Sequence, residues 1–244
     1  MRDYAKEYEG RVAFIRALVE RAHADGIVFG NSGGKDSALV GILCKAACGD
    51  TVGVLLPCGS KRSYGADADD GRALAEAFGI ETRTVDLGAA REELISALGE
   101  AARLNDAALT NLAPRLRMTA LYAIAAAENR LVAGTGNRSE IYMGYFTKWG
   151  DGASDFDPIA DLTAGEVFEF LEYLGAPRQI IDKAPSAGLF DGQTDEQEMG
   201  VSYAAIDAYI LSGEASEKDR AIIERYHRQS EHKRTGAAFY TEGE

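Results

Sequence analysis

Apolar residues near the N-terminus recur every three or four positions, which is the spacing of one face of an α-helix. They are Tyr8, Val12, Ile15, Leu18 and Val19. The pattern stops at Asp25-Gly26, a pair of residues that commonly ends a helix. The chain is therefore predicted to begin with an amphipathic helix.

Short apolar runs and helical patterns then alternate along the chain. The predicted strands cover residues 27–29, 51–56, 81–85 and 131–133, and the predicted helices cover 36–48, 65–78, 89–98 and 115–128. Strands that alternate with helices of this kind favour a doubly wound parallel sheet with helices on both faces. The predicted fold class is therefore α/β.

The pattern changes after residue 135. Residues 136–161 are rich in Gly, Asp and Asn without a clear period, and a long loop of this kind is usually functional. Thr163 and Glu166 form a capping box that predicts the start of another helix. The helices predicted in this half cover 164–173, a short segment opened by Pro177, 202–210 and 216–228, with an irregular loop at 185–196.

Charge and composition limit the partners of the chain. Its 244 residues include 39 acidic and 26 basic ones, which gives a net charge of −13. Such a surface repels phosphate backbones and anionic lipids, so we expect no nucleic-acid and no membrane partner. The apolar stretches are too short for a membrane span, and the polar start does not resemble a signal peptide. We expect a cytoplasmic protein that acts on small molecules.

The cysteines and histidines give no sign of a metal centre. Cys44 and Cys48 would share a helical face, but no histidine lies close enough in sequence to complete a zinc site, and Cys58 stands apart. We expect all three to be ordinary thiols. The three histidines are scattered, which makes a Ser/His/Asp triad unlikely as the basis of catalysis.

The clearest chemical signal is the run Ser32-Gly33-Gly34-Lys35-Asp36-Ser37, which follows the first predicted strand and opens a helix. Backbone N–H groups that glycine leaves unobstructed can converge on phosphate oxygens at the positive end of that helix. Asp36 can hold magnesium on the phosphates. The run matches neither GxxxxGK[ST] nor GxGxxG, and a simple Asp-capped turn is the alternative interpretation.

This run resembles the PP-loop of the N-type ATP pyrophosphatases, which split ATP between its α and β phosphates. The resemblance implies a Rossmann-like sheet of the adenine nucleotide α-hydrolase type. No repeat or linker divides the chain, so we predict a single domain over residues 1–244. Its parts are an N-terminal helix (1–25), a nucleotide-binding core (26–200), and C-terminal helices with a basic tail (201–244).

Five ordered blocks in the second half resemble the signatures of ammonia-dependent NAD synthetase. They are GTGNRSE at 134–140, GYFTKWGDG at 144–152, PIADL at 158–162, PSAGL with GQTDE at 185–196, and SEHKR at 230–234. The resemblance implies that the carboxylate of deamido-NAD attacks the α-phosphorus of ATP and pyrophosphate leaves. Ammonia then displaces AMP from the acyl-adenylate to give NAD.

The resemblance also implies roles for individual residues. The implied ATP-binding residues are Gly30, Asn31, Ser32, Gly33, Gly34, Lys35, Asp36, Ser37, Thr135 and Ser186. The implied ligands of deamido-NAD are Arg115, Lys148, Asp155, His232 and Lys233. Asp36 and Glu140 are the implied magnesium ligands, and the implied catalytic residues are Asp36, Glu140, Lys148 and Asp155. A homodimer whose dinucleotide site is shared between subunits is implied as well.

The sequence departs from the family pattern at several positions. The family usually has Lys where Ala164 stands, so we expect Lys35 to take over part of the phosphate clamp. The alternative is that Lys35 faces solvent. Ala113-Pro114 replaces the usual Lys-Ala before Arg115, and the Pro that commonly follows the His-Lys-Arg run is missing.

Other interpretations of the chain stay open at this point. It could be a PP-loop ATP pyrophosphatase that amidates or thiolates another acid or tRNA, although the acidic charge argues against tRNA. It could also be a nucleotide-binding module without turnover, which the presence of Asp36 and Glu140 disfavours. Arg115 and Arg117 could belong to a solvated helix face, and residues 232–234 to a disordered tail. The chain is too short to include a glutaminase domain, so free ammonia is the expected nitrogen donor.

Overall fold

The structure, a computed structural model, describes residues 2–183 and 194–240. Within these residues, one sheet contains four parallel strands in the order β3-β2-β1-β4. The strands are β1 (Gly26–Gly30), β2 (Thr51–Leu55), β3 (Glu81–Thr84) and β4 (Arg130–Ala133). The predicted parallel α/β sheet is thereby confirmed, and each strand lies within one or two residues of its predicted position.

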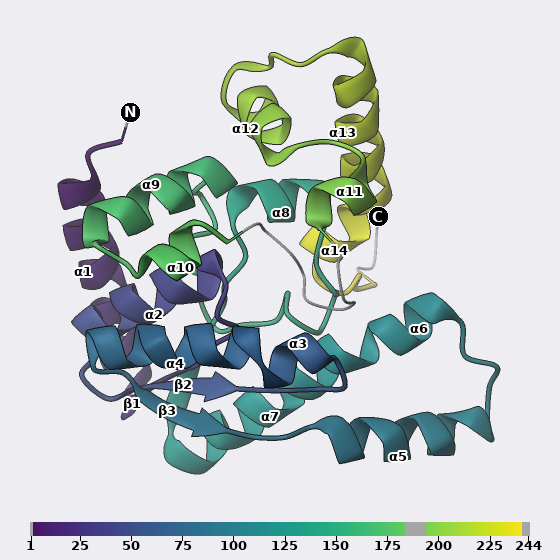
Figure 1. Cartoon of the computed structure of the whole chain (residues 1–244), viewed down its shortest axis with the longest axis horizontal. Helices are drawn as coiled ribbons and strands as arrows, with labels where there is room; N and C mark the ends of the chain where they lie inside the picture. The colour runs from purple at the N-terminus through teal and green to yellow at the C-terminus, as the bar shows by residue number, and fades with distance from the viewer. Residues whose placement is uncertain (1, 184–193, 241–244) are drawn as a thin grey trace.

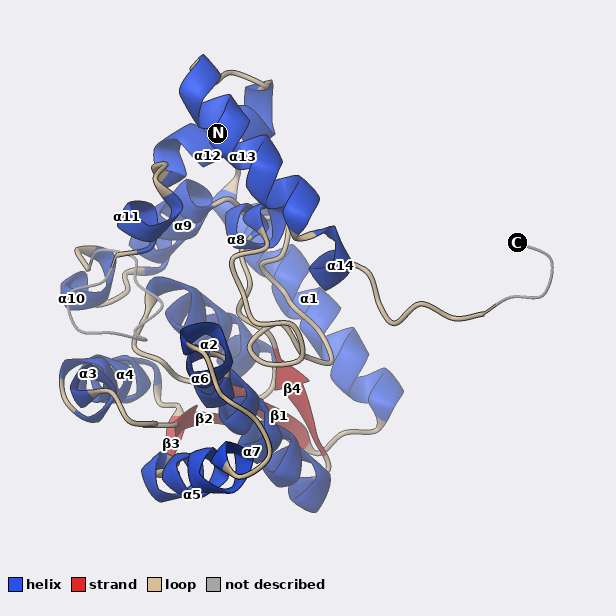
Figure 2. Cartoon of the chain, turned by 90° about the vertical axis from the view of Figure 1, so that its right-hand side faces the viewer, coloured by secondary structure: helices blue, strands red, loops and turns tan. Residues whose placement is uncertain are grey.

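The first half of the chain supplies the helices that cover the sheet. They are α1 (Tyr4–Ala22), α2 (Lys35–Ala47), α3 (Lys61–Tyr64), α4 (Ala66–Phe78), α5 (Gly88–Gly99), α6 (Asp106–Thr110) and α7 (Leu112–Glu128). Helices α2 and α4 contact one face of the sheet and α7 the other, so the sheet lies between two helical layers (Figure 2). None of the helices in the described part of the chain is long and apolar enough to cross a membrane.

The second half of the chain is helical and lies largely beside the sheet (Figure 1). Its helices are α8 (Arg138–Met143), α9 (Ala164–Leu174), α10 (Arg178–Ile181), α11 (Asp195–Met199), α12 (Tyr203–Ser212), α13 (Glu217–Gln229) and α14 (Glu231–Arg234). The predicted capping box of Thr163 and Glu166 is present at the start of α9. A buried cluster that includes Met143, Ala164 and Ile223 joins these C-terminal helices to α8 and α9.

The side chains of β1 alternate between the two faces of the sheet, as strand geometry requires. Ile27 and Phe29 pack in the core that α1, α2 and α9 cover. Val28 packs on the opposite face with residues of α7 such as Ala113 and Ala125. The central strand is therefore buried on both sides, which fixes the position of the loop that follows it.

Within the described residues, five short helices lie where the apolar pattern predicted none, namely α3, α6, α8, α11 and α14. α8 lies inside residues 136–161, which were predicted to be an irregular loop, and α6 follows the N-cap Asn105. Helix α8 starts with a reciprocal capping box between Asn137 and Glu140. All five helices are too short for a hydrophobic period to develop, so the apolar pattern gave no signal for them.

Candidate active site

The loops that follow β1 and β4 meet at the carboxyl edge of the sheet. β1 and β4 are neighbours, whereas β2 and β3 extend the sheet from the other side of β1. Such a reversal of strand order opens a crevice beyond the carboxyl ends of the strands. A cavity of about 1350 Å³ lies there, and both loops contribute to its wall.

The glycine-rich turn after β1 can adopt its shape only with glycine at position 33. Gly33 has a φ of +69°, and a Cβ atom there would lie 2.2 Å from the backbone oxygen of Asp67. Gly34 caps α2 without a side-chain hydrogen bond, so no side chain of the cap occupies the free N–H groups at the start of this helix. The Ser32 and Ser37 hydroxyl oxygens lie 3.0 Å apart across the turn. The turn therefore contributes hydroxyl and backbone groups to the cavity wall, and its binding of phosphate stays a prediction.

Asn31 connects this turn to α4. Its side chain is buried and donates from Nδ2 to the Gly71 carbonyl oxygen on α4 at 2.8 Å. Lys183 also holds the turn, because its ammonium donates to the Gly33 carbonyl oxygen at 3.2 Å. The same ammonium pairs with Asp67 at 2.8 Å and Asp70 at 2.6 Å. Lys183 was not predicted as a site residue, because no spacing in the sequence marks it.

The two carboxylates predicted to hold magnesium lie close together in the cavity wall. Asn137 donates from Nδ2 to Asp36 Oδ1 at 3.0 Å, and its own Oδ1 accepts the Glu140 N–H at 3.0 Å. The Lys35 ammonium lies 2.5 Å from Asp36 Oδ2 and 4.0 Å from Glu140 Oε1. The loops after β1 and β4 therefore build one polar group of four side chains.

Lys35 is only 6% exposed, so the alternative that it faces solvent is wrong. The prediction that it binds ATP phosphates stays a prediction. Burial lowers the pKa of Lys35, but the carboxylates of Asp36 and Glu140 outweigh burial, and the net shift of the pKa is upward. Lys35 is therefore charged at neutral pH.

Burial also acts on Glu140, whose pKa it raises well above the usual range, and the neighbouring Asp36 carboxylate adds to this upward shift. The Lys35 ammonium opposes the shift. A second cation beside Glu140 would lower its pKa for the same Coulombic reason. The site is therefore electrostatically suited to a metal ion on a polyphosphate.

The cavity brings together most of the predicted ATP-binding residues. Those that line it are Gly30, Asn31, Ser32, Gly34, Lys35, Asp36, Ser37 and Thr135, together with Glu140 and Lys233. Ser186 lies outside the described residues. The remaining predicted ligands of deamido-NAD, which are Arg115, Lys148, Asp155 and His232, do not line the cavity.

Arg115 belongs to α7 and His232 to α14, whereas Lys148 and Asp155 lie in the loop between α8 and α9. The Asp155 carboxylate accepts hydrogen bonds from the Tyr122 hydroxyl at 3.2 Å and from the Val132 N–H at 2.8 Å. Arg115 is exposed and donates to the Lys148 carbonyl oxygen at 3.4 Å. Asp155 is thus hydrogen-bonded to Tyr122 of α7, the helix to which Arg115 belongs.

The basic run 232–234 is helical and attached to the loop before it, so its description as a disordered tail is wrong. Lys233 donates to the carbonyl oxygens of Gly144 at 2.8 Å and Phe146 at 2.7 Å. In return, the Lys148 ammonium donates to the His232 carbonyl oxygen. Burial lowers the pKa of Lys233. The two lysines thus hold α14 against residues 144–148.

Arg117 is half-buried and lines the cavity, so the alternative that it belongs to a solvated helix face is wrong. Its Nε donates to the Leu56 carbonyl oxygen at 3.0 Å, just beyond β2. Burial lowers its pKa, and in the described part of the chain no carboxylate lies within ion-pair distance. The helical spacing of Arg117 from Pro114 and Leu121, which also line the cavity, was the available signal.

A parallel sheet whose first strand leads through a glycine-rich turn into an uncapped helix defines an α/β nucleotide-binding protein. The family model of NAD synthase matches residues 7–239 of this chain. The chain therefore belongs to the NAD synthase family.

Individual relatives agree with this assignment. An NH(3)-dependent NAD(+) synthetase from Carboxydothermus hydrogenoformans is 45% identical over 235 residues, which cover 95% of this chain and 96% of the relative. The structure of an NMN synthetase from Francisella tularensis matches with a TM-score of 0.93 and 38% identity, covering 98% of this chain and 99% of that chain. An NH3-dependent NAD synthetase from Campylobacter jejuni matches with a TM-score of 0.79 and 27% identity, covering 99% and 100% of the two chains.

Proposed function

We propose that this chain catalyses the ATP-dependent amidation of deamido-NAD with ammonia, with release of AMP and pyrophosphate. The observation that carries the proposal is the glycine-rich turn at the uncapped start of α2, next to Asp36 and Glu140 in one cavity. This arrangement suits a triphosphate, because N–H groups and a helix N-terminus stabilise anionic oxygens. Membership of the NAD synthase family supports the choice of the acid substrate.

The residues proposed to bind ATP act mainly through the backbone of the turn. The N–H groups of residues 35–37 and the hydroxyls of Ser32 and Ser37 would meet the phosphates at the start of α2. The N–H groups of Gly33 and Gly34 donate instead to Asn31 Oδ1 and Ser32 Oγ. Thr135 follows β4 on the other side of the crevice and lines the same cavity. With Ser186, these residues would hold the α-phosphorus in reach of the attacking carboxylate.

Magnesium fits the proposed site. Asp36 and Glu140 offer hard carboxylate oxygens from two helices that one asparagine, Asn137, ties together. These two residues would hold the ion, which would neutralise charge on the phosphates when bound. The protein's own contribution is to place both carboxylates beside the phosphate-binding turn and to shield them partly from bulk water.

We propose that deamido-NAD is bound by Arg115, Lys148, Asp155, His232 and Lys233, and that the protein is a homodimer. Arg115 on α7 and Asp155, which is hydrogen-bonded to Tyr122 of α7, do not line the cavity. A second subunit packed on α7 would bring such residues to the edge of a shared site. The Ala-rich segment 118–127 of that helix permits close helix packing. Sedimentation of the wild-type protein as a monomer at micromolar concentration would contradict the dimer.

Further parts of the proposal concern the whole chain. We propose that residues 1–244 act as a single domain, with the helix at 1–25, the nucleotide-binding core at 26–200 and the C-terminal part at 201–244. Lys148 and Asp155 are proposed to act together with Asp36 and Glu140 in catalysis. The proposed location is the cytoplasm.

The test is a direct assay with purified protein, deamido-NAD, ATP, Mg²⁺ and ammonium. We expect NAD, AMP and pyrophosphate in equal amounts, with glutamine a poor replacement for ammonium. Formation of ADP and phosphate instead would contradict the proposed cleavage between the α and β phosphates. Pyrophosphate release without an acid substrate would indicate a different acceptor.

A second candidate function is the amidation of the mononucleotide that corresponds to deamido-NAD. The observation that favours it is the TM-score of 0.93 with the Francisella tularensis NMN synthetase, against 0.79 with the Campylobacter jejuni NAD synthetase. Both acids carry the same nicotinate carboxylate, so the chemistry at ATP is unchanged. The two substrates assayed side by side separate the candidates, because the enzyme prefers the one with the higher kcat/KM.

A further inference from the structure

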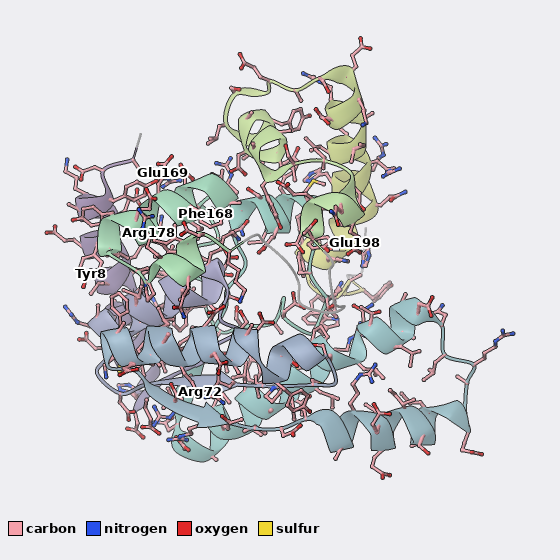
Figure 3. The ribbon with its side chains drawn as sticks, in the orientation of Figure 1. Tyr8, Arg72, Phe168, Glu169, Arg178 and Glu198 are labelled. Carbon is pink, nitrogen blue, oxygen red and sulfur yellow. The ribbon has the colours of Figure 1, made fainter. Side chains whose placement is uncertain are left out.

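The ammonium of Lys35 is enclosed by negative charge and aromatic rings. It lies 2.5 Å from Asp36 Oδ2 and 4.0 Å from Glu140 Oε1. The ring centroids of Phe168 and Tyr203 are 5.7 Å and 5.5 Å away. Figure 3 labels Phe168 on α9, which packs against α2. Lys35 is therefore held in one position by groups from four different helices.

The carboxylates that hold Lys35 are the two proposed as magnesium ligands. An ammonium ion neutralises their charge through hydrogen bonds, whereas Mg²⁺ requires oxygen ligands in near-octahedral geometry at Mg–O distances of about 2.1 Å. The two cations cannot use the same carboxylate oxygens at once. Because the ammonium is buried, its repulsion of a second cation a few ångströms away is weakly screened.

We propose that Lys35 is an internal counter-cation that keeps the Asp36–Glu140 pair at low affinity for free divalent metal. The consequence is an order of binding: the metal enters with ATP, whose phosphates supply the negative charge that the occupied carboxylates lack. Lys35 is then a positioning residue that acts through the carboxylates. This inference rests on the proposed function only for the identity of the metal ligands.

The direct test is a titration of the nucleotide-free protein with Mn²⁺, followed by the electron paramagnetic resonance signal of the free ion. Lys35→Met is expected to bind Mn²⁺ at least tenfold more tightly than the wild type, which corresponds to about 1.4 kcal/mol. Lys35→Arg keeps the charge and is expected to stay within threefold of the wild type. Lys218→Met removes a lysine from the exposed side of α13 and serves as the matched control.

A second titration includes α,β-methylene-ATP, a nucleotide that cannot be cleaved between the α and β phosphates. Wild-type protein is expected to gain at least tenfold in Mn²⁺ affinity when this nucleotide is present, and Lys35→Met is expected to gain less. The proposal is overturned if Lys35→Met binds Mn²⁺ no more tightly than Lys218→Met in the absence of nucleotide. It is also overturned if the nucleotide raises affinity equally in both proteins.

The removal of a buried charge could unfold the protein, so the same prediction is also made for Lys35→Gln. Thermal unfolding with and without Mg²⁺ gives a readout that needs no substrate. Both variants are expected to gain more in Tm from Mg²⁺ than the wild type, and an equal gain counts against the proposal. If the variants show these changes in metal binding but the wild-type protein does not make NAD, the proposed function is overturned and this inference stands.

Discussion

Asn137 donates from Nδ2 to Asp36 Oδ1 at 3.0 Å, which joins the cap of α8 to the first turn of α2. The same amide accepts the Glu140 N–H through its Oδ1. One buried side chain thus fixes the two carboxylates that we propose as magnesium ligands. Since the two helices follow the neighbouring strands β1 and β4, the register of the sheet determines how far apart these carboxylates lie.

This relationship predicts the effect of Asn137→Ala. The variant loses an N-cap and the hydrogen bond to Asp36, so its free energy of unfolding should fall by about 1–2 kcal/mol. Its kcat should fall as well, because Asp36 is no longer held beside Glu140. Urea denaturation and the NAD-forming assay measure the two effects.

Ser216→Ala is the control for this variant, because it removes the N-cap of α13 far from the cavity. It should cost a similar free energy of unfolding and leave kcat unchanged. If the two cap variants have the same kcat, Asn137 has no role in positioning Asp36.

The carboxylates themselves should matter for turnover and little for folding. Asp36→Asn and Glu140→Gln are each expected to lower kcat by about 10² or more at saturating Mg²⁺, as the loss of one electrostatic stabiliser typically does. Asp69→Asn removes an exposed carboxylate of α4 and should leave turnover intact. Near-normal rates in either site variant would remove that residue from the proposed machinery.

A pair of glycine substitutions tests the shape of the phosphate-binding turn. Gly33→Ala places a Cβ atom 2.2 Å from the Asp67 backbone oxygen and requires a left-handed residue at φ +69°, so ATP binding should be lost. Gly10→Ala in α1 meets no atom within 4 Å and should raise the free energy of unfolding by about 0.5–1 kcal/mol. Equilibrium binding of ATP and urea denaturation give the comparison. Unchanged ATP affinity in Gly33→Ala would contradict the proposed role of the turn.

Asp157 should make stability depend on pH. Burial raises its pKa from 3.8 to about 6, although its oxygens accept the Ile159 and Gly136 N–H groups. Between these values the folded protein holds a proton that the unfolded chain has lost, so stability falls as the pH rises. Relative to Asp157→Asn, the wild type should lose up to about 3 kcal/mol between pH 4 and pH 7. Parallel urea stability curves for the two proteins over this range would show that the pKa of Asp157 is not raised.

Much of this fold was predictable because its elements carry strong local signals. The glycine-rich turn, the capping box of Thr163 and the alternation of strands with long helices depend on residues close together in sequence. The short helix α8 was not predictable from periodicity, since six residues complete less than two turns. The only sequence signal for the start of α8 is the capping-box pair Asn137 and Glu140.

The site was predictable in composition but not in arrangement. The sequence placed Asp36 and Glu140 in one group through family resemblance, and the cavity contains both. It could not show that Lys35 lies between them, because that contact joins two loops about a hundred residues apart. The contacts of Lys183 and Arg117 were not predictable for the same reason: their partners, Asp67 and the Leu56 carbonyl, are distant in sequence.

Ala164 on α9 stands where the family usually has a lysine, and this chain has Lys35 on α2 instead. Ala164 opens α9, is 1% exposed, and belongs to the buried cluster that contains Tyr203. The Lys35 ammonium lies against the rings of Tyr203 and Phe168, and Phe168 is one helical turn beyond Ala164. A lysine at position 164 would therefore bring a second ammonium into the space that Lys35 already uses. Two buried ammonium groups this close together would repel each other.

Ala164→Lys should accordingly lower the free energy of unfolding by about 2 kcal/mol or more, because it buries an additional cation. In a Lys35→Ala background the same substitution should cost much less, since the carboxylates of Asp36 and Glu140 become available to the new lysine. A double-mutant cycle measured by urea denaturation should give a coupling of about 1 kcal/mol or more. Ala164→Lys paired with Lys218→Met is the additive reference. Additive costs for Lys35→Ala and Ala164→Lys would mean that the two positions do not share one cation site.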